Sequence, residues 1–149
     1  MRTCCVNPFV AFLAVVAGAC VALPAEAGDP ERGARLFSAC AACHSVIDAT
    51  GRTRVRGGRT GPNLHGVVGR YAGSVPGFPY SPAMAEAGMR GLRWTESDFV
   101  AYVRDATAFL RSYLDDQDAF GKMAYRLRTP QEARDIWAYL ERSAAPCAR

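Results

Sequence analysis

The stretch SACAACHSV, residues 38–46, places two cysteines two residues apart and a histidine directly after the second. Two common uses of such a pair are a redox disulfide and half of a structural zinc site. A redox disulfide of the thioredoxin type lies in a pattern of alternating strands and helices, which this chain does not show. Zinc needs four nitrogen or sulfur ligands, and the chain has no second Cys-x-x-Cys pair and only two histidines, His44 and His65. Both interpretations are disfavoured.

The complete motif, Cys40-x-x-Cys43-His44, is instead the signal for covalent attachment of a c-type haem. The spacing lets both sulfurs reach the two vinyl groups along one edge of a porphyrin. The histidine that follows then lies under the ring, where it can bind the iron. The motif therefore predicts one covalently bound haem c.

The first residues have the layout of a secretory signal peptide. Arg2 stands in a short polar head, residues 9–23 are an unbroken run of apolar or small residues, and Ala25-Glu26-Ala27 fits a small-x-small cleavage site. The run is too short for a good membrane span of about 20 residues. We predict a signal peptide over residues 1–27 and a single domain over residues 28–149, exported to the periplasm. An uncleaved segment that tethers the protein to the membrane is the alternative.

The chain after residue 27 is mildly basic. Its 17 basic and 13 acidic side chains give a net charge of +4, and Lys122 is the only lysine among sixteen arginines. The sequence contains no basic helix and no basic patch interleaved with aromatics, so we expect no nucleic-acid binding. A modest positive charge can steer the protein toward an acidic partner. Cys147, the cysteine left over outside the motif, is interpreted as a loosely held tail residue.

Helices are predicted on both sides of the motif. The first lies near residues 30–38, a second begins in WTESDFVAYV at residues 94–103, and a further turn or two covers residues 106–114. The last, in RTPQEARDIWAYLER at residues 128–142, is the clearest, because its apolar residues recur at helical spacing. The expected N-caps are Asp29, Thr95 and Thr129, with capping boxes that include Asp98 and Glu132.

Residues 48–82 show no such periodicity. They are rich in glycine and proline and have neither a convincing helical period nor the alternation of a strand. A compact domain seldom carries so long a loop without a reason. We expect a large bound cofactor to hold this region in place.

A second axial ligand has to come from elsewhere in the chain. The candidates are His65, Met84, Met89 and Met123. Methionine is more often core filler than a ligand, and Met84 and Met89 lie in a run that is typical of a short helix or turn. His65 lies in a turn with limited reach. Met123 is favoured because it lies in a non-helical stretch that can fold across the other face of a haem.

Several separate stretches together resemble class I cytochrome c, the soluble mitochondrial type and its larger alphaproteobacterial relatives. The resemblance covers nearly all of residues 28–142. It is carried by GDPERGARLF at 28–37, CAACH at 40–44, RTGPNLHGVVGR at 59–70, PGFPYS at 76–81, GLRW at 91–94, FVAYVRDATAFL at 99–110, KMAYRL at 122–127 and DIWAYLE at 135–141. The resemblance implies an all-α class I cytochrome c fold, in which the N- and C-terminal helices pack together and helices and long loops wrap around one covalent haem.

The resemblance also implies a role for individual residues. Cys40 and Cys43 would form the thioethers, with His44 and Met123 as axial ligands and the carbonyl of Pro62 as acceptor for the ligand histidine. The remaining implied haem contacts are Arg70, Tyr80 and Trp94 around the propionates, Tyr102 near the methionine sulfur and Tyr125 at the exposed edge. Gly33, Phe37 and Leu140 would form the contact between the first and last helices.

Two departures from the smaller relatives concern the partners rather than the ligands. The segment before Met123, DATAFLRSYLDDQDAFGKM at residues 105–123, is longer and has no proline, as in the larger bacterial members. The lysines that ring the haem edge in many relatives are almost absent, and arginines stand elsewhere. The arginines at 52, 54, 56 and 59 are interpreted as a solvated loop face, with a docking patch as the alternative.

A histidine and a methionine together close both axial positions, which leaves no site open for substrate. We therefore expect a non-enzymatic, monomeric, periplasmic one-electron carrier. By resemblance it would pass electrons from a quinol–cytochrome c reductase to a terminal oxidase, or to another acceptor such as a photosynthetic reaction centre, through transient docking to these membrane complexes. The alternatives are a peroxide-reducing haem enzyme and a ligand sensor, both with a displaceable Met123.

Overall fold

The computed structural model of the chain describes residues 27–145. Nearly all of the predicted signal peptide and also Cys147 lie outside these residues. The described part contains five helices, α1 (Pro30–Ala41), α2 (Pro82–Met89), α3 (Glu96–Arg104), α4 (Ala106–Leu114) and α5 (Pro130–Ala144), and a hairpin of two short strands, β1 (Val46–Ile47) and β2 (Thr53–Val55). The predicted all-α class I fold is confirmed, with a small antiparallel hairpin as its one addition.

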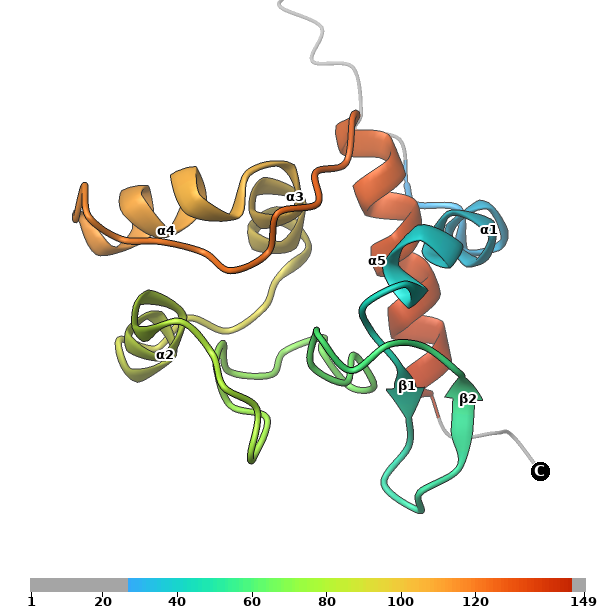
Figure 1. Cartoon of the computed structure of the whole chain (residues 1–149). Helices are drawn as coiled ribbons and strands as arrows, with labels where there is room; N and C mark the ends of the chain where they lie inside the picture. Colours follow the sequence, from blue (N-terminus) through green and yellow to red (C-terminus); the bar gives the residue numbers. More distant parts are fainter. Residues whose placement is uncertain (1–26, 146–149) are drawn as a thin grey trace, which may run out of the picture.

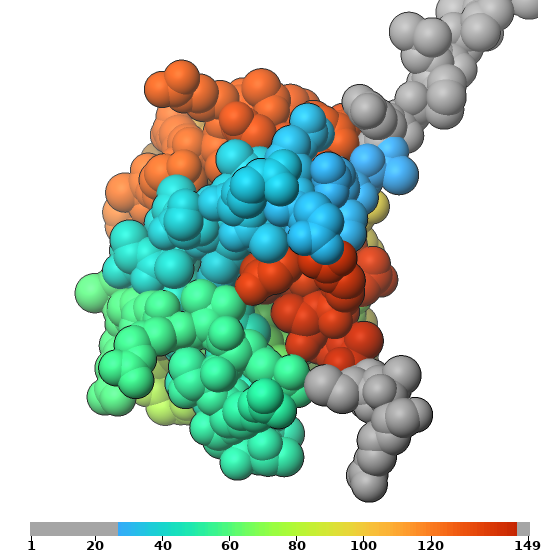
Figure 2. Space-filling model, turned by 90° about the vertical axis from the view of Figure 1, so that its right-hand side faces the viewer, coloured from blue at the N-terminus to red at the C-terminus, as the bar shows by residue number. Residues whose placement is uncertain are grey.

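The first and last helices form the main packing unit of the fold. Helix α1 crosses α5 at close range, as Figures 1 and 2 show from two sides. Gly33 permits this approach, because a Cβ atom there would collide with the backbone carbonyl of Asp135 and lie 2.9 Å from the Cβ of Tyr139. Phe37 and Leu140 are buried in the same contact, and the Phe37 ring packs on that of Tyr139 with centroids 5.3 Å apart. The close crossing therefore depends on a missing side chain.

The helix starts follow the local sequence. The side chain of Asp29 accepts hydrogen bonds from two backbone N–H groups of the first turn of α1, and Thr129 and Glu132 form the expected capping box of α5. The expected capping box of α3 is only half formed: the Thr95 side chain accepts from the Asp98 N–H, but the Asp98 carboxylate accepts from the Thr95 hydroxyl at 2.6 Å and not from the Thr95 backbone N–H. Helix α1 extends beyond the predicted residue 38 to Ala41, which places Cys40 in its last turn.

Helices α2, α3 and α4 lie on the other side of the molecule from α1 (Figure 1). Their packing is largely aromatic. The Trp94 ring meets those of Tyr102 and Phe109 at centroid distances of 5.0 and 6.2 Å. Phe99 packs on Trp137 at 5.3 Å, which joins α3 to α5. This side is thereby fixed to the crossing of α1 and α5.

The expectation of no strand in residues 48–82 is wrong at one point. Val46 pairs with Val55 and Ile47 with Thr53, with an irregularity between the two pairs. Two strands of two and three residues are too short to show alternation in the sequence. Asp48 closes the turn between them, because its carboxylate accepts bonds from the Thr50 hydroxyl and from the Thr50 and Arg52 backbone N–H groups.

The rest of the long loop is held by protein groups. The side chain of Asn63 exchanges two hydrogen bonds with the backbone of Ile47, at 3.0 and 2.7 Å. Further along, Ala72 donates to the Leu92 carbonyl, and Trp94 donates to the carbonyl of Arg70. The segment therefore needs no helix to be ordered. None of the helices within residues 27–145 is long and apolar enough to cross a bilayer.

Candidate functional site

One cavity of about 350 Å³ is lined by residues of α1 and α5 on one side of the fold and by residues of α2, α3 and the long loops on the other. Its volume is in the range of small-molecule and cofactor sites. All ten residues predicted to contact the haem line it, although they come from widely separated parts of the chain: Cys40, Cys43, His44, Pro62, Arg70, Tyr80, Trp94, Tyr102, Met123 and Tyr125. Gly33, Phe37 and Leu140 do not line it; they lie in the contact between α1 and α5.

The cysteines enter the cavity wall from the C-terminal end of α1. Cys40 is half-buried and Cys43 is exposed, and neither forms a disulfide. Burial raises the pKa of the Cys40 thiol to about 11. The backbone N–H groups of Cys43 and His44 both donate to the Cys40 carbonyl, at 3.0 and 2.9 Å. This turn fixes the two sulfurs and the imidazole relative to one another.

The imidazole of His44 is held through its Nδ1 atom. Nδ1 lies 2.8 Å from the carbonyl oxygen of Pro62. Because a carbonyl can only accept, Nδ1 carries the proton in the neutral ring, and the lone pair is on Nε2. Burial lowers the pKa of His44, and the bond to Pro62 opposes this only in part. The neutral imidazole is the form that can bind a metal.

Of the four candidates for the second ligand, two line the cavity. Met84 is a buried residue of α2, and Met123 is half-buried in the non-helical loop that follows α4. Met89 is 81% exposed and His65 does not line the cavity. Lys122, Ala124 and Tyr125, which flank Met123, also line it, so this whole segment borders the cavity. This loop, orange in Figure 1, runs past α3 and α4 toward the start of α5.

The predicted propionate contacts lie close to one another: the Arg70 charge interacts with the Tyr80 phenol, and the Arg70 carbonyl accepts from the Trp94 N–H at 3.0 Å. The guanidinium of Arg70 donates to the carbonyls of His65 and Asn63, at 2.9 and 3.0 Å. Burial lowers the pKa of Arg70, but an arginine side chain remains protonated in proteins. Burial raises the pKa of Tyr102 to about 12, so its phenol stays neutral at physiological pH and can donate a hydrogen bond.

Sequence reasoning missed several residues that shape the cavity. Lys122 is one of its lining residues, and its ammonium donates to the carbonyl of Pro79 at 2.7 Å. This bond joins the Met123 loop to a segment 43 residues earlier, so no local pattern indicates it. Asn63 and Gly61 also escaped notice as organisers of the site, although both lie inside a stretch quoted for the resemblance.

The wall of the cavity fits a covalently bound haem. It combines two cysteines that form no disulfide, an imidazole with an available Nε2 and the thioether of Met123 with a mainly apolar lining: Leu64, Val67, Phe78, Met84, Phe99, Val103 and Ile136. A soft thioether and an imidazole suit iron in a haem, whereas no carboxylate, the usual protein ligand of Mg²⁺ or Ca²⁺, lines this wall. Within residues 27–145, no group of three or more His, Cys, Asp or Glu side chains is placed to hold a metal ion by itself.

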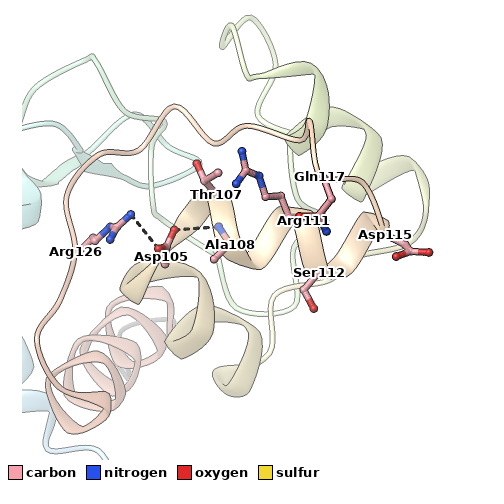
Figure 3. A pocket seen from close by; sticks show the side chains of 8 residues that line it. All are labelled: Asp105, Thr107, Ala108, Arg111, Ser112, Asp115, Gln117 and Arg126. Carbon is pink, nitrogen blue, oxygen red and sulfur yellow. Dashed lines mark hydrogen bonds and ion pairs between the residues drawn. The ribbon is translucent and has the colours of Figure 1, made fainter.

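A second concavity, on the outer side of α4, has a different character (Figure 3). It is more open and polar, with a volume of about 600 Å³, and is lined by Asp105, Thr107, Ala108, Arg111, Ser112, Asp115, Gln117 and Arg126. Three of its four charged side chains have protein partners, since Arg126 pairs with Asp105 at 2.9 Å and Arg111 donates to the carbonyl of Ala119. None of the predicted site residues lines it, so it is not the haem site.

Comparison with known proteins agrees with this assignment. The family model of cytochrome c matches residues 30–144. The chain belongs to the cytochrome c family. Members of this family with similar sequences include cytochrome c2 of Cereibacter sphaeroides, which is 46% identical over 90% of this chain and 94% of its own length. Cytochrome c-550 of Paracoccus denitrificans is 37% identical over 91% of this chain and 88% of its own length.

The crystal structure of cytochrome c2 from Rhodobacter sphaeroides superposes with a TM-score of 0.77. It is 48% identical and covers 80% of this chain and 98% of its own. As a member of the cytochrome c family, the protein carries one covalently attached haem c with histidine and methionine ligation. Both the predicted fold and the predicted cofactor are confirmed.

Proposed function

We propose that this protein is a soluble periplasmic one-electron carrier. One observation carries the proposal: His44 and Met123 both line a single, mainly apolar cavity together with Cys40 and Cys43. Ligands supplied by the protein on both faces of a haem leave no position for a substrate. The haem supplies the one-electron couple, and the chain supplies its attachment, its ligands and its insulation.

Each group of residues has a separate task in this proposal. Cys40 and Cys43 would anchor the haem through thioethers, and His44 would bind the iron through Nε2 while the Pro62 carbonyl holds Nδ1. Met123 would provide the second protein ligand, a soft thioether that favours the ferrous form and raises the reduction potential. Arg70, Tyr80 and Trp94 would neutralise or hydrogen-bond the propionates, and Tyr102 would stand near the methionine sulfur.

The apolar wall supports the same activity. Buried Val67, Met84 and Trp94 exclude water from the cavity, which disfavours the extra positive charge of the ferric state. A rigid ligand set changes little when an electron is gained, so each transfer needs little reorganisation. At the rim, Cys43, Ala124 and Tyr125 are exposed, and Tyr125 covers the edge through which we expect electrons to pass.

The proposed partners are membrane redox complexes. Electrons would come from a quinol–cytochrome c reductase and go to a terminal oxidase, or to another acceptor such as a photosynthetic reaction centre, through brief and weak docking of a monomer. The similar proteins named cytochrome c2 and cytochrome c-550 support the carrier role. Residues 1–27 would direct export and be removed after Ala27; retention of this segment as a membrane tether is the alternative.

A stopped-flow experiment tests the function. The purified ferric protein is mixed with isolated quinol–cytochrome c reductase and a quinol, and then, once reduced, with a cytochrome c oxidase. The proposal predicts rapid reduction and rapid reoxidation that slow as salt is added. Slow reaction with both complexes, together with turnover of hydrogen peroxide by the ferric protein, would instead establish the peroxide-reducing enzyme.

A further inference from the structure

The loop at residues 57–61 packs closely on the segment that carries the haem-attachment motif. Three glycines of residues 57–61 lie against the segment from Ala41 to His44. Gly58 donates its N–H to the carbonyl of Ala41 at 2.9 Å, and Gly61 donates to that of Cys43 at 2.8 Å. This green segment runs back from β2 past the end of α1 in Figure 1. The loop and the attachment segment are therefore in contact along their backbones.

Gly61 has a distinct place in this contact. A Cβ atom on Gly61 would lie within 2.7 Å of three atoms of the His44 ring, Cε1, Nδ1 and Nε2. By contrast, Gly57 and Gly58 face backbone atoms of Ala41, Ala42, Cys43 and His44. Gly61 is also not one of the glycines with positive φ. It is needed for the space it leaves and not for an unusual backbone conformation.

We propose that Gly61 is a positioning residue for the His44 ring. Its bare backbone lies against one face of the imidazole, while the adjacent Pro62 carbonyl holds Nδ1 at 2.8 Å. Two consecutive residues thus fix both the tilt and the rotation of the ring, and with them the direction in which Nε2 points. The proposal rests on the assignment of His44 as the axial ligand.

The geometry indicates what a side chain at position 61 would do. Ordinary contacts of a Cβ atom begin near 3.4 Å, so the ring or the loop has to move by about 1 Å. The ring cannot move with its backbone, because the His44 N–H is bonded to Cys40 at 2.9 Å and Gly57 lies against the His44 carbonyl. The ring must rotate or tilt, which weakens its bond to Pro62. A weaker bond from Nδ1–H makes the imidazole a poorer electron donor and disfavours ferric iron.

The wild-type protein provides the first test. In the ferrous, diamagnetic protein, a nuclear Overhauser effect is expected between the Gly61 α-protons and the His44 ring proton on Cε1. This measurement needs no variant. If the ring orientation is otherwise assigned and no such contact is seen, the proposal is overturned.

The variant Gly61→Ala tests the consequence. We expect about a tenfold shift of the ferric–ferrous equilibrium toward the ferrous form, the lower end of the range for a lost outer partner of a metal ligand. For one electron this corresponds to a potential about 59 mV higher. The ferric spectrum should also report an altered imidazole orientation by electron paramagnetic resonance.

Gly88→Ala is the matched control. A Cβ atom there would collide with the carbonyl of Ala72, a comparable steric cost without contact to His44. It should lower stability and leave both the potential and the resonance signals unchanged. Equal potentials for wild type and Gly61→Ala would refute the positioning role. If His44 is not the ligand at all, the wild-type spectrum itself lacks histidine ligation, so this failure is distinguishable.

Discussion

The buried carboxylate of Asp135 offers a quantitative test of how the two terminal helices are joined. Asp135 is fully buried in α5 and accepts hydrogen bonds from the backbone N–H of Asp29 at 2.9 Å, from Gln131 at 3.2 Å and from the guanidinium of Arg32. The replacement Asp135→Asn keeps the size of the side chain but removes its charge. In addition, the NH₂ group of the asparagine replaces one carboxylate oxygen, so it faces an N–H donor of Asp29, Gln131 or Arg32 without being able to accept its hydrogen bond.

The expected cost follows from the surroundings of each partner. Removing one member of a buried ion pair typically costs about 3–5 kcal/mol. The side chain of Arg32 is 45% exposed and can regain water, which reduces that cost. We expect Asp135→Asn to lower the free energy of unfolding by about 2–3 kcal/mol, a decrease in Tm on the order of 10 °C for a domain of this size.

A second ion pair between the same helices serves as the control. Arg142 bonds Glu31 at 2.7 Å, and both side chains are largely exposed, at 48% and 70%. Glu31→Gln should therefore cost less than about 1 kcal/mol. Both variants are compared by urea denaturation followed by circular dichroism. Equal effects of the two substitutions, or a cost below about 0.5 kcal/mol for Asp135→Asn, would refute the reasoning.

The pH dependence gives an independent check. Burial alone would raise the pKa of Asp135, but the bonds from Arg32, Asp29 and Gln131 outweigh it and hold the pKa below its ordinary value. The stabilisation is therefore fully present above the unfolded pKa, about 3.9, and is lost as the pH falls toward the folded value. Asp135→Asn should show a flatter loss of stability below about pH 4 than the wild type does.

Three further predictions concern other parts of the fold. Gly33→Ala should destabilise the protein by about 1–3 kcal/mol in urea denaturation, because the added methyl group collides with the Asp135 carbonyl in α5; an unchanged midpoint would contradict the close crossing. Lys122→Met removes the hydrogen bond to the Pro79 carbonyl. Amide hydrogen exchange in residues 115–129 should therefore speed up several-fold, while the free energy of unfolding changes by less than about 1 kcal/mol. Unchanged exchange would show that this bond does not hold the loop. If the arginines at 52, 54, 56 and 59 form a docking patch, the double variant Arg52→Glu with Arg56→Glu should be reduced more slowly by the quinol–cytochrome c reductase, and the rate should depend less on salt, at an unchanged reduction potential. Equal reduction rates for the variant and the wild type would identify a solvated face.

Much of the architecture could be predicted because its signals are local. Asp29, Thr95 and Thr129 cap helices within three residues of themselves, and Cys40 to His44 carry their chemistry in five consecutive positions. Such features depend on the nearest neighbours in the chain. The final helix is the most clearly predicted element because its capping residues, Thr129 and Glu132, and its apolar periodicity all lie within residues 128–142.

The features that were missed depend on distant partners. The hairpin of β1 and β2 has too few residues to show alternation, and its backbone is held by Asn63, 16 residues from Ile47. The partner of Lys122 lies 43 residues away, and that of Asp135 lies more than 100 residues away in α1. No local sequence pattern singles out Gly61, and only the folded structure places it against an imidazole.

The choice between two cavity-lining methionines is the most direct test of the account. Ferric protein is prepared as wild type, Met123→Leu and Met84→Leu, and mass analysis first establishes that haem is covalently attached in each. The account predicts the red charge-transfer band of methionine bound to ferric iron in the wild type and in Met84→Leu, and its loss in Met123→Leu. A wild type without this band, or a band that survives in Met123→Leu, would contradict the assignment of Met123 as the second axial ligand.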